Sequence, residues 1–259
     1  MGQRKQTKGK CVFCGREMTR SGLARHLQTC PERMKANEQA NQLPGRQGTL
    51  IHLQVQDADW GEFWLHLEMK GSVTLEKLDA YLRSIWLECC GHLSMFSTGG
   101  WGEDEEVPMQ SRAASVFTPG VELTHIYDFG TTSYTTVKVV SVRRGKPLTR
   151  YPIYLMARNG AIVLPCDVCG QPATFLCIEC CQMGEDRGYL CNVHARQHTH
   201  NYAGYEDEDD SELADDDSEL TADDSEFEDD EIYGEFLMSI FNSPRTGMCG
   251  YDGPAEPPY

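Results

Sequence analysis

The stretch LIHLQVQDADWGEFWLHLEMK (Leu50–Lys70) alternates apolar and polar residues on both sides of the polar segment DADWG. Alternation with a period of two is typical of a β-strand that buries one face. In each half the apolar side chains share a face, namely Ile51, Leu53 and Val55, then Phe63, Leu65, Leu67 and Met69. The pattern predicts two strands joined in a hairpin.

A helix is predicted directly after this hairpin, in TLEKLDAYLRSIWLECC, with Thr74 as its N-cap. Its apolar residues recur at helical spacing: Leu75, Leu78, Leu82, Ile85 and Trp86. Four later segments have the composition of strands: HLSMF, VELTHIYDF, SYTTVKVVSV and YPIYLMA. The predicted fold class is therefore α+β, an antiparallel sheet with a packed helix.

The segments GHLSMF and HIYDFGTTSYTTVKVV carry a family resemblance. A helix followed by a His-x-x-x-Phe strand, here His92 to Phe96, and a Tyr-Asp-Phe-Gly turn, here Tyr127 to Gly130, resembles the plasmid pRiA4b Orf-3-like family. The resemblance covers about residues 48–158. It implies the α+β fold for a domain at 48–160 and says little about function.

Residues 8–34 have the ligand spacing of a zinc finger. In CVFCGREMTRSGLARHLQTC, Gly15 closes a turn around Cys11 and Cys14, and Ser21 is the expected N-cap of a helix. His26 and Cys30 are four residues apart and share one face of that helix. These two pairs predict one zinc ion whose binding energy helps the module fold. A polar linker is expected at 35–47.

A second cysteine-rich module is predicted at residues 165–202. The stretch CDVCGQPATFLCIECCQMGEDRGYLCNVHARQHTH arranges its candidate ligands in pairs: Cys166 and Cys169, Cys177 and Cys180, Cys191 and His194, His198 and His200. A disulfide framework would not need the histidines, and a catalytic cysteine would not need regular pairs. Eight ligands predict two closed structural zinc sites, so three zinc ions are expected for the whole chain.

The order of these pairs resembles B-box and related cross-brace zinc modules. The resemblance implies one site of Cys166, Cys169, Cys191 and His194, and a second of Cys177, Cys180, His198 and His200. Cys181 is an alternative to Cys180, and a single zinc among reduced thiols is the alternative to two. Cys89, Cys90 and Cys249 have no partner in the spacing and are expected to be buried thiols.

Charge is distributed unevenly along the chain. The net charge is −17, but residues 205–231 hold 17 of the 40 acidic residues and no basic ones. This segment is predicted to be disordered. Residues 1–35 instead hold nine Lys or Arg against Glu17 and Glu32.

The basic finger predicts association with nucleic acid, for which Arg16, Arg20, Arg25 and Gln28 are the candidate contacts. The acidic segment could then act as an autoinhibitor that competes for the basic face, or merely keep the chain in solution. The alternatives are an adaptor that binds proteins or self-associates, and, more remotely, an enzyme with a ligand near Asp128 and His92. No nucleophile–base motif accompanies those two residues, which favours a non-catalytic protein.

The remaining expectations concern location and the C-terminal segment. No apolar run reaches the length of a membrane span and no signal peptide is visible, so the chain is expected in the reducing cytoplasm, where cysteines serve as thiols and metal ligands. Residues 232–259 are predicted to dock on the body of the protein or on a partner. There, Phe236, Leu237, Ile240 and Phe241 would form a short helical face ending at Pro244.

Overall fold

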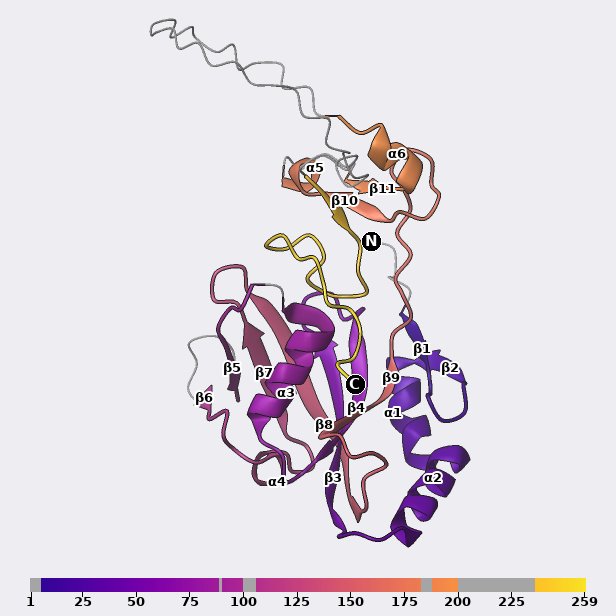
Figure 1. Cartoon of the computed structure of the whole chain (residues 1–259), viewed down its shortest axis with the longest axis vertical. Coiled ribbons are helices and arrows are strands. Elements are labelled where there is room, and N and C mark those ends of the chain that lie inside the picture. The colour runs from indigo at the N-terminus through magenta and orange to yellow at the C-terminus, as the bar shows by residue number, and fades with distance from the viewer. Residues whose placement is uncertain (1–5, 89, 100–105, 183–187, 200–235) are drawn as a thin grey trace, which may run out of the picture. The chain divides into compact units, whose positions relative to one another are not determined.

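The computed structural model describes residues 6–88, 90–99, 106–182, 188–199 and 236–259 (Figure 1). The chain divides into two compact units, residues 1–163 with 239–259, and residues 164–238. The acidic segment 205–231 lies outside the described residues. Within the part of the chain that is described, no helix is both long enough and apolar enough to cross a membrane.

The first unit is built on a seven-stranded antiparallel sheet, which confirms the α+β class. The strand order is β6-β5-β7-β8-β3-β4-β9. The bounds are β3 (Gly48–Asp57), β4 (Trp64–Lys70), β5 (Ser94–Ser97), β6 (Glu106–Val107), β7 (Glu122–Tyr127), β8 (Ser133–Gly145) and β9 (Ile153–Arg158). The predicted hairpin is present as β3 and β4, with Leu53 opposite Leu67.

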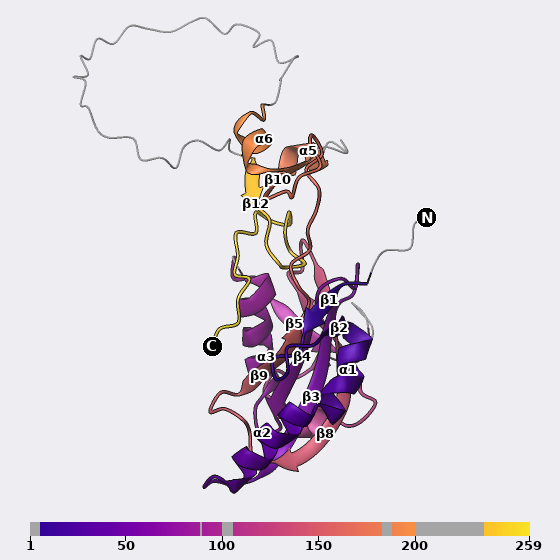
Figure 2. The same ribbon diagram turned by 90° about the vertical axis from the view of Figure 1, so that its right-hand side faces the viewer.

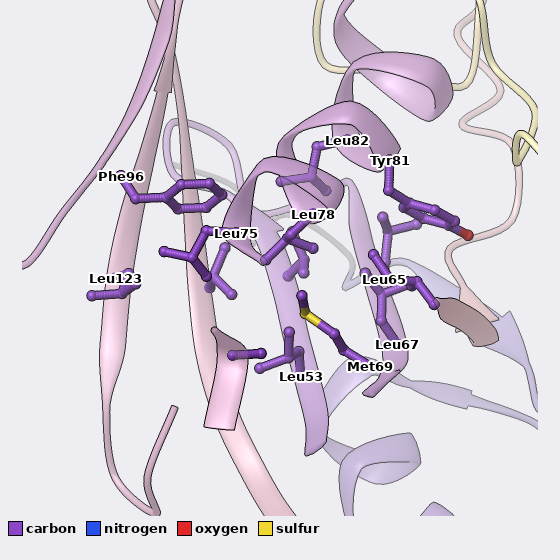
Figure 3. Packing of buried hydrophobic residues seen from close by; sticks show 14 of the residues in the cluster. Leu53, Leu65, Leu67, Met69, Leu75, Leu78, Tyr81, Leu82, Phe96 and Leu123 are labelled. Atoms are coloured by element: carbon purple, nitrogen blue, oxygen red, sulfur yellow. The ribbon is translucent and has the colours of Figure 1, made fainter. Parts of the chain in front are cut away.

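One face of this sheet packs against α3 (Leu75–Leu82) and the π-helical turn Arg83–Leu87 that continues it. Figure 3 shows leucines of α3 directed onto the apolar side chains of β3 and β4. All five apolar positions predicted for the helix are fully buried, and Thr74 is its N-cap. The short helix α4 (Ala113–Val116) adds Ala113 to the same core. The apolar positions predicted for the hairpin and the helix therefore face each other across this core.

The N-terminal finger covers the opposite face of the sheet over β4 and β9, as Figure 2 shows. The finger consists of β1 (Lys8–Lys10), β2 (Glu17–Thr19) and α1 (Arg20–Thr29), and α2 (Pro31–Gln42) follows it. Its buried residues form one apolar cluster with the sheet: Cys11, Leu23, Leu27 and Cys30 with Trp64, Met156 and Ala157. The finger is thus part of the first unit.

Two local expectations are corrected here. The N-cap of α1 is Thr19, whose hydroxyl accepts a hydrogen bond from Gly22 N, and Ser21 lies inside the helix. The polar linker expected at 35–47 is helical as far as Gln42. Pro31 at the start of α2 fits a first helical turn, and the residues that follow are mostly good helix formers despite their polarity.

Polar residues of β3 and β4 that face the finger are buried and paired. Glu68 accepts hydrogen bonds from Arg33 of α2 at 2.8 Å and from Arg143 of β8 at 2.8 and 2.9 Å. His66 Nε2 lies 3.0 Å from the carbonyl oxygen of Arg20, to which it donates, and its Nδ1 lies 3.0 Å from His52 Nε2. Burial lowers the pKa of His66 to about 4, so the ring is neutral at pH 7.

The C-terminal segment returns to the first unit. Ser243 Oγ donates to the carbonyl oxygen of Trp86 at 2.6 Å, and the buried Arg245 pairs with Asp128 at 2.9 Å. Tyr251 is buried, and the ring of Tyr259 stacks on that of Tyr151. Docking on the body of the protein, one of the two expected outcomes, is therefore the arrangement observed.

The second unit is a small three-stranded sheet of order β11-β10-β12 with two short helices. Its elements are β10 (Phe175–Cys177), α5 (Ile178–Gln182), β11 (Tyr189–Leu190), α6 (Asn192–Arg196) and β12 (Leu237–Ser239). The helix expected from Phe236 to Phe241 is wrong, because Leu237 to Ser239 form the edge strand beside β10. The apolar spacing favoured a helix, but pairing with the edge of the sheet determines the conformation of this segment.

Glu68→Gln is expected to lower the free energy of unfolding by about 3–5 kcal/mol, because it leaves two arginines without their buried carboxylate. Urea unfolding followed by tryptophan fluorescence measures the change. The matched control is Glu122→Gln, which breaks the exposed pair with Lys138 and should cost less than about 1 kcal/mol. Equal effects of the two substitutions would contradict the structural role of Glu68.

Candidate metal centres

The finger brings together the four side chains expected as its ligands. The ligand atoms of Cys11, Cys14, His26 and Cys30 all lie within 4.8 Å of one another. Cys11 and Cys14 come from the turn after β1, His26 from the last turn of α1, and Cys30 from its C-cap. Cys14 Sγ lies 3.1 Å from His26 Nε2.

The second unit holds two further clusters of candidate ligands. Cys166, Cys169, Cys191 and His194 form the first cluster. Its Sγ–Nδ1 distances to His194 are 3.5 Å from Cys166 and 3.3 Å from Cys191, and Cys169 Sγ lies 3.8 Å from Cys191 Sγ. Cys191 is the N-cap of α6 and His194 lies within that helix, so one short helix supplies two of the four side chains.

The other cluster of this unit contains Cys177, Cys180 and His198. Cys180 Sγ lies 3.4 Å from His198 Nε2. His200, expected as the fourth ligand, lies outside the described residues. Cys180 belongs to the cluster, whereas its neighbour Cys181 is exposed and does not.

These separations fit tetrahedral coordination. With Zn–S bonds of about 2.3 Å and Zn–N bonds of about 2.0 Å, the edges of a tetrahedron measure about 3.8 Å between two sulfurs and about 3.5 Å between sulfur and nitrogen. The five separations given above range from 3.1 to 3.8 Å, and all other pairs within a cluster lie within 4.8 Å. The clusters can therefore each hold a metal ion, while the identity and the number of ions stay predictions.

The same backbone turn presents the first cysteine pair of each unit. In Cys11–Gly15 the amide of Gly15 donates to the carbonyl oxygen of Cys11 at 2.8 Å, and in Cys166–Gly170 the amide of Gly170 donates to that of Cys166 at 2.8 Å. Both glycines have φ near +72°, a left-handed conformation that other residues adopt at a cost. The sequence Cys-x-x-Cys-Gly is thus the local signal for both turns.

Electrostatics differ between the clusters. Burial raises the pKa of Cys11 to about 11, so an unliganded finger holds this thiol protonated. At Cys166 burial acts in the same direction, but hydrogen bonds from the backbone of Cys191, Cys169 and Val168 outweigh it and lower the pKa to about 6. Since metals bind the thiolate, the turn around Cys166 favours the ligand form at neutral pH.

Of the four nucleic-acid contacts expected on the finger, Arg16, Arg25 and Gln28 are exposed. Arg20 is half-buried and donates to the carbonyl oxygen of Gly61 at 3.3 Å. Arg33, part of the basic surroundings of the finger, is buried against Glu68. Packing of α1 and α2 on the sheet withdraws Arg20 and Arg33 from the surface, which the sequence pattern did not indicate.

The expectation that Cys90 and Cys249 are buried thiols is wrong, because both are exposed. They lie together with the half-buried His92, and the three ligand atoms are within 4.8 Å of one another. Cys89 lies outside the described residues. The local signal was the spacing Cys90-x-His92, but the third member is 157 residues away from His92 and no spacing rule connects it.

Comparisons with known proteins do not identify the chain. No family model matches it, and no curated protein matches it. Among solved structures it is similar to the crystal structure of a protein of unknown function, MM3350 from Methanosarcina mazei Go1, with 17% sequence identity and a TM-score of 0.35. The match covers 40% of this chain and 66% of that chain, and at this score it carries no argument. The pRiA4b Orf-3-like and B-box resemblances therefore stay predictions.

Gly15→Ala is expected to lower the free energy of unfolding of the first unit by about 1–2 kcal/mol, because alanine is strained at φ +72°. Urea unfolding of the metal-loaded protein, followed by tryptophan fluorescence, measures this. Gly48→Ala is the control, since it lies in a strand with open space around its Cα and no positive φ. A loss no larger than that of the control would argue against a strained cysteine turn.

Proposed function

We propose that this protein is a non-catalytic zinc-binding protein in which three structural zinc ions hold the finger and the two cross-braced clusters. The observation that carries the proposal is the agreement of the sulfur–nitrogen and sulfur–sulfur separations with tetrahedral edges. Thiolate and imidazole ligands favour zinc over magnesium or calcium, which prefer oxygen. Four protein ligands would leave no position for a reacting water, which supports a structural role.

The second unit supplies the strongest reason for a structural metal. Among the described residues of this unit, the apolar cluster contains four buried ones, Cys177, Cys180, Leu190 and Ala195, and two of these are candidate ligands. A core of this size cannot offset the conformational entropy of ordering the unit. Metal binding would provide the missing free energy. The sheet of the first unit has a large apolar core of its own and does not share this dependence.

Chelation of the metal is expected to expose the amides of residues 164–199 to hydrogen exchange while the amides of β3 and β8 stay protected. The second unit should lose its order because its ligands are also its core. Exchange followed by mass spectrometry measures both regions in one sample, and added zinc should restore protection. Protection of residues 164–199 that survives complete metal removal would refute the structural role.

We also propose that the protein associates with nucleic acid through the exposed side of the finger. Arg16, Arg25, Lys8 and Lys10 of the finger are exposed, as is Lys35 of α2. Cations on one face neutralise phosphates and release counterions. Fewer cations are available than the sequence suggested, because Arg20 and Arg33 are engaged in contacts within the fold.

The acidic segment 205–231 is proposed as a competitor for that basic face. It carries 17 acidic residues and no basic ones on the same chain, so its effective concentration at the finger would be high. The remaining features of the proposal are a pRiA4b Orf-3-like domain at 48–160, a B-box-like module at 165–202 and a reducing, cytoplasmic location suited to thiolate ligands.

Binding to labelled duplex DNA and RNA, measured by fluorescence anisotropy across a salt series, tests the proposal. The double substitution Arg16→Gln and Arg25→Gln should weaken binding and reduce the slope of log K against log salt by about 2, one for each phosphate contact removed. The control pair Arg112→Gln and Lys138→Gln removes the same charge from exposed positions on the central domain and should leave the slope unchanged.

Deletion of residues 205–231 should tighten binding if the acidic segment competes for the finger. An unchanged affinity would remove the autoinhibitory role and leave nucleic-acid binding intact. No binding by either form would contradict the nucleic-acid proposal and favour the alternative of an adaptor that binds proteins or self-associates.

A further inference from the structure

Cys90, His92 and Cys249 form a cluster in the first unit that neither the finger nor the second unit includes. Cys90 and His92 lie between the π-helical turn and β5, and Cys249 lies in the C-terminal segment. Their ligand atoms are within 4.8 Å of one another, and Cys249 Sγ lies 3.5 Å from His92 Nε2. This distance equals the sulfur–nitrogen edge of a tetrahedral zinc site, about 3.5 Å.

We infer that Cys90, His92 and Cys249 are the protein ligands of a further metal site, which takes a soft divalent cation such as zinc. Two thiolates and an imidazole are ligands that this class of cation prefers. The site is additional to the three proposed above and does not depend on them, since it shares no residue with their clusters.

The surrounding contacts hold two of the ligands in place. The carbonyl oxygen of His92 accepts a hydrogen bond from Arg83 at 2.6 Å, and the His92 ring meets the ring of Tyr127 edge-on at 5.9 Å. Cys249 lies in a turn in which Met248 N donates to the Arg245 carbonyl at 2.8 Å. Because Arg245 is itself buried against Asp128, the turn that carries Cys249 is fixed to the domain.

Two residues with unusual backbone conformation lie at this cluster. Among the residues that the structure describes, Asp128 and Cys249 are the non-glycine residues with positive φ, at 64° and 50°. Both lie next to His92, since Asp128 Oδ2 and Cys249 Sγ are each 3.5 Å from His92 Nε2. Left-handed backbone at ordinary residues costs free energy and is concentrated at functional sites. One of the two residues with positive φ, Cys249, is a proposed ligand, and the other, Asp128, lies beside the ligand His92.

The arginines around the cluster are already paired with carboxylates. Asp128 already pairs with Arg245, and Arg83 already pairs with Asp79 and Glu88. These arginine charges are thus balanced within the fold. A dication bound between Cys90 and Cys249 would offset the charge of the two thiolates that coordinate it.

The proposed site has three ligands among the described residues, as does the cluster of Cys177, Cys180 and His198, whereas the other two clusters have four. No fourth Cys, His, Asp or Glu joins the group among the described residues, and both cysteines are exposed. With these three protein ligands alone, a tetrahedral cation would keep one coordination position for water or an external ligand. The bound cation would therefore exchange more readily than one held by four ligands, and it would tie the C-terminal segment to the domain.

The test is the metal content of the purified full-length chain, measured by mass spectrometry of the metal and normalised to protein. Cys249→Ser and, separately, His92→Gln should each lower the zinc content by one equivalent per chain. Cys181→Ser is the matched control, because it removes an exposed cysteine that belongs to no cluster and should leave the content unchanged. Urea unfolding of each variant establishes that the first unit remains folded.

Cadmium substitution followed by ¹¹³Cd NMR gives a readout at the level of the site. One resonance should disappear in both Cys249→Ser and His92→Gln while the others keep their positions. Unchanged metal content and an unchanged spectrum in both variants would overturn the inference, as would a Cys90–Cys249 disulfide in the zinc-treated protein purified under reductant. Cys11→Ser distinguishes this site from the finger, because it should remove a different resonance.

Discussion

Burial of strands β3 and β4 on both faces is the constraint on which the first unit depends. One face carries only apolar side chains and packs against α3, as an alternating hairpin requires. The other face carries Trp64, His66 and Glu68, which are equally inaccessible to water. Such a face is stable only when something covers it and satisfies its polar groups. The finger and α2 do both.

This arrangement links the metal cluster of the finger to the sheet. Cys11 and Cys30 are at once candidate ligands and members of the apolar cluster that includes Trp64. Gly9 lies so close to β9 that an added Cβ would overlap the carbonyl oxygen of Arg158. A metal in the finger would thus fix the position of α1, and α1 in turn shields His66 through its contact with the Arg20 carbonyl.

The C-terminal segment has a comparable role at another part of the same domain. Arg245 places its guanidinium over the ring of Tyr127 at 4.9 Å and donates to Asp128, Ser133 and the Thr131 carbonyl. A buried arginine without such partners would be strongly destabilising. These contacts fix the segment next to His92, which is how Cys249 reaches a histidine far away in the sequence.

Short-range patterns in the sequence were sufficient to predict two strands, a helix and two cysteine turns. Alternation defined β3 and β4, helical spacing defined α3, and Cys-x-x-Cys-Gly defined the turns at Cys11 and Cys166, because each depends on residues a few positions apart. Three other features arise only in the folded chain: Arg20 and Arg33 lose exposure, Leu237 joins a sheet edge, and Cys249 lies beside Cys90 and His92. Those outcomes depend on contacts between distant segments, whose formation is governed by packing and charge pairing in the assembled fold and leaves no periodicity in the sequence.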